Sequence, residues 1–209
     1  MNIEDIAKKM CQKGKGILAA DESTGTIAKR FKTINVENTE VNRVSFRETL
    51  FSSQGMKDYI GGVILFDETI RQKSSDGIPI PKLIKKNGAI PGIKVDKGAK
   101  KLAGSSEETI TEGLDGLRER LKEYYDLGAR FTKWRAVYKI TSNLPSLQCI
   151  KSNAHALARY ASLVQEANMV PIVEPEVLMD GTHSAEDCLI KTSEVIRKCF
   201  DELILHQVD

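Results

Sequence analysis

Short apolar runs alternate with longer stretches of helical period along the chain. The apolar runs lie at 16–20, 61–67, 92–96, 129–137 and 169–175, and strict alternation of polar and apolar residues is rare within them. Brief continuous apolar runs are typical of parallel strands that are covered on both faces. We therefore predict five strands at these positions.

Three stretches between or after the strands have an amphipathic helical pattern. Residues 111–128 end at a glycine, and residues 152–168 begin at Ser152, which could cap a helix. Residues 184–206 begin at Ser184, with acidic residues in the first turn, where they complement the helix dipole. These three segments are predicted to be helices.

The apolar stripe of the last predicted helix is formed by Leu189, Ile196 and Leu203. At the N-terminus, apolar residues at helical spacing predict a short helix rather than the apolar core of a signal peptide. The segment 72–92 is rich in Gly, Pro and Lys, and we predict a loop there.

Five strands alternating with helices indicate βα units and a parallel sheet. A doubly wound sheet and a barrel both fit this pattern. The sequence has no Gly-x-Gly-x-x-Gly after its first strand and no P-loop, which weakens the nucleotide-binding versions of the doubly wound fold. Because no repeat or linker is visible in the 209 residues, we expect one domain over residues 1–209.

Composition excludes several classes of protein. The 31 Lys and Arg residues nearly balance the 29 Asp and Glu residues, so a net charge of +2 gives no general attraction to nucleic acid or to an anionic membrane. No apolar run approaches the roughly 18 residues of a membrane span. The four cysteines and three histidines are scattered along the chain. We expect reduced thiols, a cytoplasmic location and no metal site.

Charged residues fall within or directly after the predicted strands. Lys133 and Arg135 are two residues apart in the otherwise apolar segment 129–140, so on a strand they share one face. The pair Lys94 and Asp96 and the pair Glu174 and Glu176 have the same spacing, and Asp21 follows the first strand. We expect these groups at the C-terminal ends of the strands, where active sites form in barrels and in open sheets.

Inward-facing cations and carboxylates should meet in one cavity, because burying an unpaired charge costs several kcal/mol. Arg135 could bind phosphate or carboxylate in a bidentate manner. A lysine in a dry setting could donate a proton or attack a carbonyl, and two carboxylates could divide the acid and base roles. The residues alone therefore predict chemistry on a phosphorylated carbonyl compound.

Six motifs carry a resemblance to a known family. The segment "GKGILAADESTGTIAKRF" (14–31) resembles the N-terminal signature of the class I fructose-bisphosphate aldolases. The similarity continues in chain order to the last residue, through "GVILFDET" (62–69), "GIKVDKG" (92–98), "GLDGL" (113–117), "KWR" (133–135) and "VPIVEPEVLMDGTHS" (170–184).

The resemblance implies a (β/α)8 TIM barrel and the reversible cleavage of fructose 1,6-bisphosphate to glycerone phosphate and glyceraldehyde 3-phosphate. The reaction proceeds through a lysine Schiff base and needs no cofactor or metal. This chain would be an incomplete barrel, with an N-terminal helix and about the first five βα units. Its partners would be a small sugar phosphate and, at full length, copies of itself, since the family is commonly tetrameric.

The resemblance also assigns roles to residues. Glu174 would be the general acid and base of Schiff-base formation with Glu176 beside it, and Asp21 would assist carbon–carbon cleavage. Lys133 would stabilise charge in the cavity. The substrate-binding residues would be Arg30, Lys94, Arg135, Ser23 and Thr26.

One departure from the family is large. The family's Schiff-base lysine lies on the sixth barrel strand, in a segment similar to "LKPNM", whereas this chain ends at "LHQVD". We therefore expect a truncated aldolase chain that is inactive alone. One alternative is a naturally short, non-catalytic aldolase-like protein that binds a sugar phosphate or a protein. Another is a different phosphosugar barrel that uses Lys133 as its own Schiff-base residue.

Overall fold

The chain divides into two compact units in the computed structural model, which describes residues 2–209. The first unit comprises the chain up to Lys94 together with residues 120–132 and 168–170. The second comprises residues 95–119, 133–167 and 171–209. The expectation of a single domain stays a prediction.

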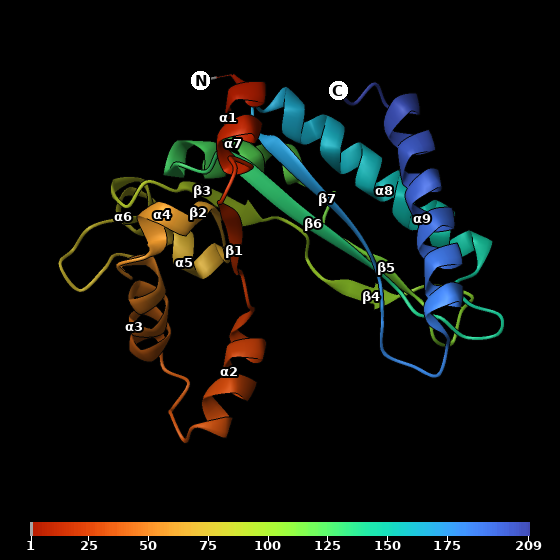
Figure 1. Cartoon of the computed structure of the whole chain (residues 1–209), viewed down its shortest axis with the longest axis horizontal. Helices are drawn as coiled ribbons and strands as arrows, with labels where there is room; N and C mark the ends of the chain where they lie inside the picture. Colours follow the sequence, from red (N-terminus) through yellow and green to blue (C-terminus); the bar gives the residue numbers. More distant parts are fainter. Residues whose placement is uncertain (1) are drawn as a thin grey trace. The chain divides into compact units, whose positions relative to one another are not determined.

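A parallel sheet has the strand order β1-β2-β3-β6-β7 (Figure 1). Neighbouring strands in the sheet therefore follow one another in the sequence. A doubly wound sheet instead reverses its order at a switch point, so the sequential order is that of a barrel. This confirms the predicted α/β fold of an incomplete barrel. The strands are β1 (Gly16–Ala20), β2 (Ile60–Leu65), β3 (Ile90–Lys94), β6 (Phe131–Tyr138) and β7 (Val170–Val177).

Short helices accompany the first three strands, and four of these helices pack against the second or the third strand. The N-terminal helix is confirmed, since Ile6 and Met10 are buried. A helix also occupies part of 72–92, where a loop was expected, because Pro81 suits its first turn and Leu83 packs inward. The helices are α1 (Ile3–Met10), α2 (Thr24–Thr33), α3 (Glu40–Phe51), α4 (Met56–Tyr59), α5 (Asp67–Arg71), α6 (Ile80–Lys86) and α7 (Leu117–Leu127).

The predicted helix at 111–128 begins later than expected. Its first residue belongs to β5 (Thr109–Thr111), which pairs in an antiparallel manner with β4 (Ala99–Lys101). Gly113 and Gly116 follow with positive φ angles, a conformation that no right-handed helix contains. The helical pattern is therefore realised only from α7 onward.

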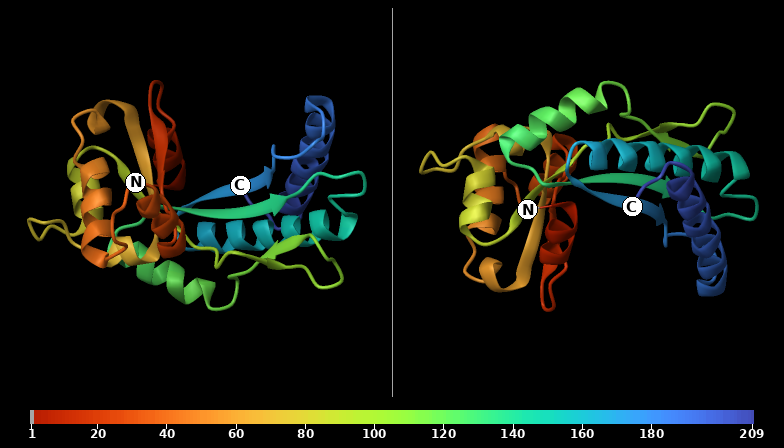
Figure 2. Two further views of the ribbon diagram at one scale, coloured as in Figure 1. Left: turned by 90° about the horizontal axis from the view of Figure 1, so that it is seen from below. Right: turned by 90° about the horizontal axis from the view of Figure 1, so that it is seen from above.

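Helix α8 (Leu147–Glu166) begins earlier than the predicted cap at Ser152. The Oγ atom of Ser146 accepts a hydrogen bond from the Cys149 amide and donates one to Glu108, whose buried carboxylate fixes the cap. Tyr160 of α8 packs against Trp134 with ring centroids 5.3 Å apart and donates a hydrogen bond to the Ile172 carbonyl. Figure 2 shows α8 running along β6 and β7.

The last helix, α9 (Ala185–Leu205), begins at the predicted cap Ser184 and lies beside α8 (Figure 1). Its predicted apolar stripe is wrong, because Leu189 is 67% exposed and Ile196 is 40% exposed. The buried residues are instead Val195 and Cys199. Val195 is one residue before Ile196, so the packed face lies about 100° around the helix from the predicted one.

A buried ion cluster lies beneath the segment that follows β1. Arg47 is fully buried, and its Nη2 donates to the carbonyl of Glu22 at 2.6 Å. Arg43 donates to both oxygens of Glu68 at 2.8 and 2.5 Å, and Arg47 lies 3.6 Å from the same carboxylate. Burial lowers the pKa of Arg47, and the hydrogen bonds from Arg43 hold the pKa of Glu68 below its usual range.

Glu68→Gln should destabilise the fold by about 3 kcal/mol near neutral pH, because it leaves two arginines without their shared counter-ion. Since the pKa of Glu68 is depressed in the folded state, its stabilisation is present above about pH 4.3 and is lost as the pH falls further. The variant should therefore also lose part of the acid dependence of thermal unfolding between pH 3 and pH 7. Glu123→Gln, at an exposed pair with Arg71 in the same unit, is the control and should change stability far less.

Gly92→Ala should destabilise the fold by about 1–3 kcal/mol, because a Cβ at this position would overlap the ring of Phe131. The neighbouring Gly62 is similarly close, with its Cβ position 3.1 Å from the same ring. The measurement is the midpoint of urea unfolding. Gly16→Ala, where a Cβ meets nothing within 4 Å, is the control. Equal costs at the two glycines would contradict the packing argument.

Candidate functional site

The charges predicted on β6 and β7 lie on one face of each strand. Along β6, Trp134, Ala136 and Tyr138 have no exposed surface, whereas Lys133 and Arg135 on the alternate positions are only half-buried. This confirms the shared face of the two cations. Their expected place at the C-terminal end of the strand is wrong for Lys133, because β6 continues to Tyr138.

Each of these cations is paired with a carboxylate of β7. Lys133 Nζ lies 3.3 Å from Glu174 Oε2, and Arg135 Nε contacts Glu176 Oε2. The Lys133 side chain is 12% exposed and that of Glu174 is 35% exposed, so the first pair is the drier one. The structure thus pairs the cations of β6 with the carboxylates of β7, and the single cavity in which they were expected to meet stays a prediction.

A buried polar network holds the backbone of Arg135. Its carbonyl accepts a hydrogen bond from Thr111 Oγ1 at 2.7 Å, and the Thr111 amide donates to Asn153 Oδ1 at 3.1 Å. On the other side, the Arg135 amide donates to Asp96 Oδ2 at 3.4 Å, and Asp96 Oδ1 accepts from Gly98. The sequence drew attention to Asp96 by its spacing from Lys94, but nothing in the sequence indicates the role of Thr111 or Asn153.

The other predicted site residues belong to the first unit. Asp21 directly follows β1 and is 9% exposed, and Lys94 is the last residue of β3. Ser23 caps α2, with its Oγ accepting from the Thr26 amide at 3.3 Å and lying 3.1 Å from Thr26 Oγ1. The start of α2 therefore presents hydroxyl groups and backbone amides, which suit an anion.

Arg30 lies on the same helix and forms an ion pair with Glu22 at 2.5 Å, with 59% of the Arg30 side chain exposed. Arg47 donates a hydrogen bond to the carbonyl of Glu22. Sequence reasoning missed Arg43 and Arg47, although their spacing of four on a helix was visible and places both on one face.

The four cysteines are free thiols, as expected. Burial raises the pKa of Cys149 and of Cys199 to about 11, so these two thiols are poor nucleophiles at neutral pH. None of the described helices is both long and apolar enough to span a bilayer.

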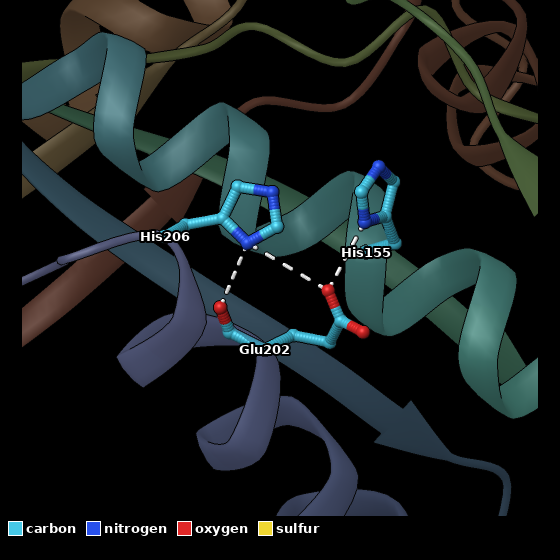
Figure 3. A group of neighbouring side chains, drawn as sticks. All are labelled: His155, Glu202 and His206. Carbon is cyan, nitrogen blue, oxygen red and sulfur yellow. Dashed lines mark hydrogen bonds and ion pairs between the residues drawn. The ribbon is translucent and has the colours of Figure 1, made fainter.

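Two of the three histidines, although scattered in the sequence, lie together in the fold. His155 and His206 lie with ring centroids 4.9 Å apart, and Glu202 lies between them (Figure 3). Within residues 2–209 this is the one group of three side chains whose arrangement could hold a metal ion.

Known proteins match nearly the whole chain. Residues 2–209 match the family described as "Glycolytic: Fructose-bisphosphate aldolase class-I". A protein of Xanthomonas campestris pv. campestris named "Probable fructose-bisphosphate aldolase class 1" is 58% identical over 206 residues, which are 97% of this chain and 62% of that protein. "Fructose-bisphosphate aldolase 6, cytosolic" of Arabidopsis thaliana is 56% identical over 93% of this chain and 54% of its own length.

A solved structure has the same fold. It is the fructose-bisphosphate aldolase of Plasmodium falciparum in complex with TRAP and a small-molecule inhibitor. The match has a TM-score of 0.96 and 50% sequence identity, and it covers 98% of this chain and 59% of that one. The chain thus spans less than two thirds of the length of these relatives. It belongs to the class I fructose-bisphosphate aldolase family.

Proposed function

We propose that this chain supplies the charged side chains of a Schiff-base aldolase that reversibly cleaves fructose 1,6-bisphosphate to glycerone phosphate and glyceraldehyde 3-phosphate. The observation that carries the proposal is the double ion pair between β6 and β7, Lys133 with Glu174 and Arg135 with Glu176. Such a face supplies both a cation for an anionic substrate and a carboxylate for proton transfer.

Glu174 is the proton carrier in this proposal. Forming a Schiff base requires that the carbinolamine lose its hydroxyl as water, and a nearby acid assists by donating a proton. Glu174 is half-buried, and its Oε2 lies 3.3 Å from the ammonium group of Lys133, so a proton-transfer group and a cation lie side by side. Arg135 binds a substrate oxyanion, in competition with its present partner Glu176.

The first-unit residues have separate roles. Asp21 is the carboxylate that assists carbon–carbon cleavage, and Lys94 orients substrate hydroxyls. Arg30, Ser23 and Thr26 bind phosphate, supported by the exposed Arg30 guanidinium and by the amides at the start of α2.

The 209-residue chain does not carry the Schiff-base lysine in this proposal, and it does not turn over substrate alone. The resemblance places that lysine in a segment similar to "LKPNM", which these residues do not contain. In this proposal the full-length protein is a cytoplasmic enzyme, in keeping with a relative named as a cytosolic aldolase. Its assembly with copies of itself rests on the family resemblance alone.

Borohydride trapping tests the division of roles. The purified chain is incubated with glycerone phosphate and reduced, and its intact mass and modified peptides are measured. We expect no adduct at Lys133 or Lys94, because these lysines support the reaction without attacking the carbonyl. A full-length aldolase such as the Arabidopsis relative, treated in parallel, should be labelled. An adduct at Lys133 would overturn the proposal in favour of Lys133 as the nucleophile.

Substrate binding can be tested without turnover. Isothermal titration of the chain with fructose 1,6-bisphosphate should show weak binding that Arg135→Ala reduces by about 10–100-fold, as expected for the loss of a charge-assisted hydrogen bond of about 1.5–3 kcal/mol. Arg118→Ala is the matched control, since Arg118 is also an arginine of the second unit paired with a glutamate, Glu166. Equal affinity of both variants, or no binding by the unmodified chain, would count against the assigned role of Arg135.

A further inference from the structure

Two histidines and a glutamate from two helices converge on the surface of the second unit (Figure 3). His155 lies on α8, Glu202 lies near the end of α9, and His206 is the residue that caps the C-terminus of α9. His155 Nδ1 lies 3.0 Å from Glu202 Oε2, and His206 Nδ1 lies 3.6 Å from the same oxygen. One carboxylate oxygen is thus shared by two imidazoles.

The packing of α9 produces this convergence. Val195 and Cys199 are its buried residues, and Glu202 and His206 continue the same face at spacings of three and four. That face therefore carries two apolar residues and then two metal-ligating residues. The cluster is a consequence of how α8 and α9 pack, so its geometry does not depend on a mobile loop.

The donor set suits a divalent transition metal. Two imidazole nitrogens and one carboxylate oxygen are ligands that zinc accepts, with a fourth position left for water. Donor atoms bound tetrahedrally at about 2.0–2.2 Å from one zinc ion are about 3.4 Å apart. The 3.0 Å between His155 Nδ1 and Glu202 Oε2 is close to that value, and one donor atom from each residue lies within 4.8 Å of the others.

The hydrogen bonds of the two histidines leave a nitrogen lone pair on each ring available to a metal ion. His206 Nδ1 lies 2.9 Å from the carbonyl of Glu202, and a hydrogen bond to that carbonyl would fix the ring orientation. A neutral imidazole keeps a lone pair on one nitrogen, so each histidine offers one metal-binding atom in either tautomer. A hydrogen bond from the other ring nitrogen to a carbonyl is the usual support of a metal-binding histidine.

The cluster is also accessible and carries the required charge. The side chains of His155, Glu202 and His206 are 52%, 25% and 22% exposed, so an ion can reach them from solvent. Lys198, which precedes Glu202 by four residues on α9, forms its ion pair with Asp201 at 2.9 Å. The ion pairs described for Glu202 are those with the two histidines.

We propose that His155, Glu202 and His206 bind one zinc-like divalent transition-metal ion, which ties α8 to α9. The ion replaces the hydrogen bond that now links His155 of α8 to Glu202 of α9 with three coordination bonds. Because it binds only the packed helix pair, it stabilises the folded chain in proportion to its occupancy. The site is structural and takes no part in the Schiff-base chemistry.

Isothermal titration of the metal-free 209-residue chain with zinc chloride, in a phosphine reductant, tests the site. We expect one equivalent to bind, and we expect His155→Ala and Glu202→Gln each to weaken binding by more than about tenfold, since even an outer partner of a ligand contributes about 10–100-fold. His183→Ala removes the third histidine, which lies outside the cluster, and should leave binding unchanged. Circular dichroism of the metal-free variants verifies that they fold.

The spectrum of bound cobalt distinguishes metal binding at this cluster from metal binding at a cysteine thiolate. Cys11 is exposed and could bind zinc by itself. The visible spectrum of the cobalt-loaded chain should show nitrogen and oxygen ligation without thiolate charge-transfer bands, and zinc should raise the melting temperature of the chain but not that of Glu202→Gln. Thiolate bands, no binding, or equal binding by His155→Ala and the unmodified chain would each overturn the proposal.

Discussion

The pairing of each inward cation of β6 with a carboxylate of β7 is the constraint on which this face of the fold depends. Trp134, Ala136 and Tyr138 fill the other face of β6 with no exposed surface, so Lys133 and Arg135 cannot turn away. An unpaired charge would be costly at Lys133, whose side chain is 12% exposed, and less so at Arg135, whose side chain is 41% exposed. A one-residue shift of either strand would break both pairs at once, and the pairs therefore help to fix the register of the two strands.

The same cost of burying charge governs the segment after β1. The carbonyl of Glu22 accepts from the fully buried Arg47, and the Glu22 side chain pairs with Arg30. Arg47 in turn shares Glu68 with Arg43. Asp21 is the neighbour of Glu22 in the chain, so its position rests on charges that are remote in sequence. A short motif alone cannot create such a site, because its geometry depends on the helix that carries the two arginines.

Local pattern was enough to predict the five strands of the parallel sheet and the helices α1, α7, α8 and α9, because apolar runs and helical spacing report burial directly. It did not predict α2 to α6 or the β4–β5 pair. It failed where another segment decided the outcome. Helix α8 begins at Ser146 because a glutamate from a different segment, Glu108, accepts a hydrogen bond from that cap. The pairs of β6 with β7 could be anticipated, because spacing of two is visible in each strand separately. The support of Arg135 by Thr111 and Asn153 could not, since neither residue has a distinctive sequence context.

The orientation of α9 explains both the wrong prediction of its buried stripe and the side-chain cluster at its end. Its most apolar stripe, through Leu189 and Ile196, faces outward, and the helix instead packs through Val195 and Cys199. A helix that buries the less apolar of two possible faces is positioned by its neighbours rather than by its own pattern. Extending the buried face by three and four residues leads to Glu202 and His206. The orientation of α9, which the sequence pattern did not predict, therefore places Glu202 and His206 next to His155 of α8.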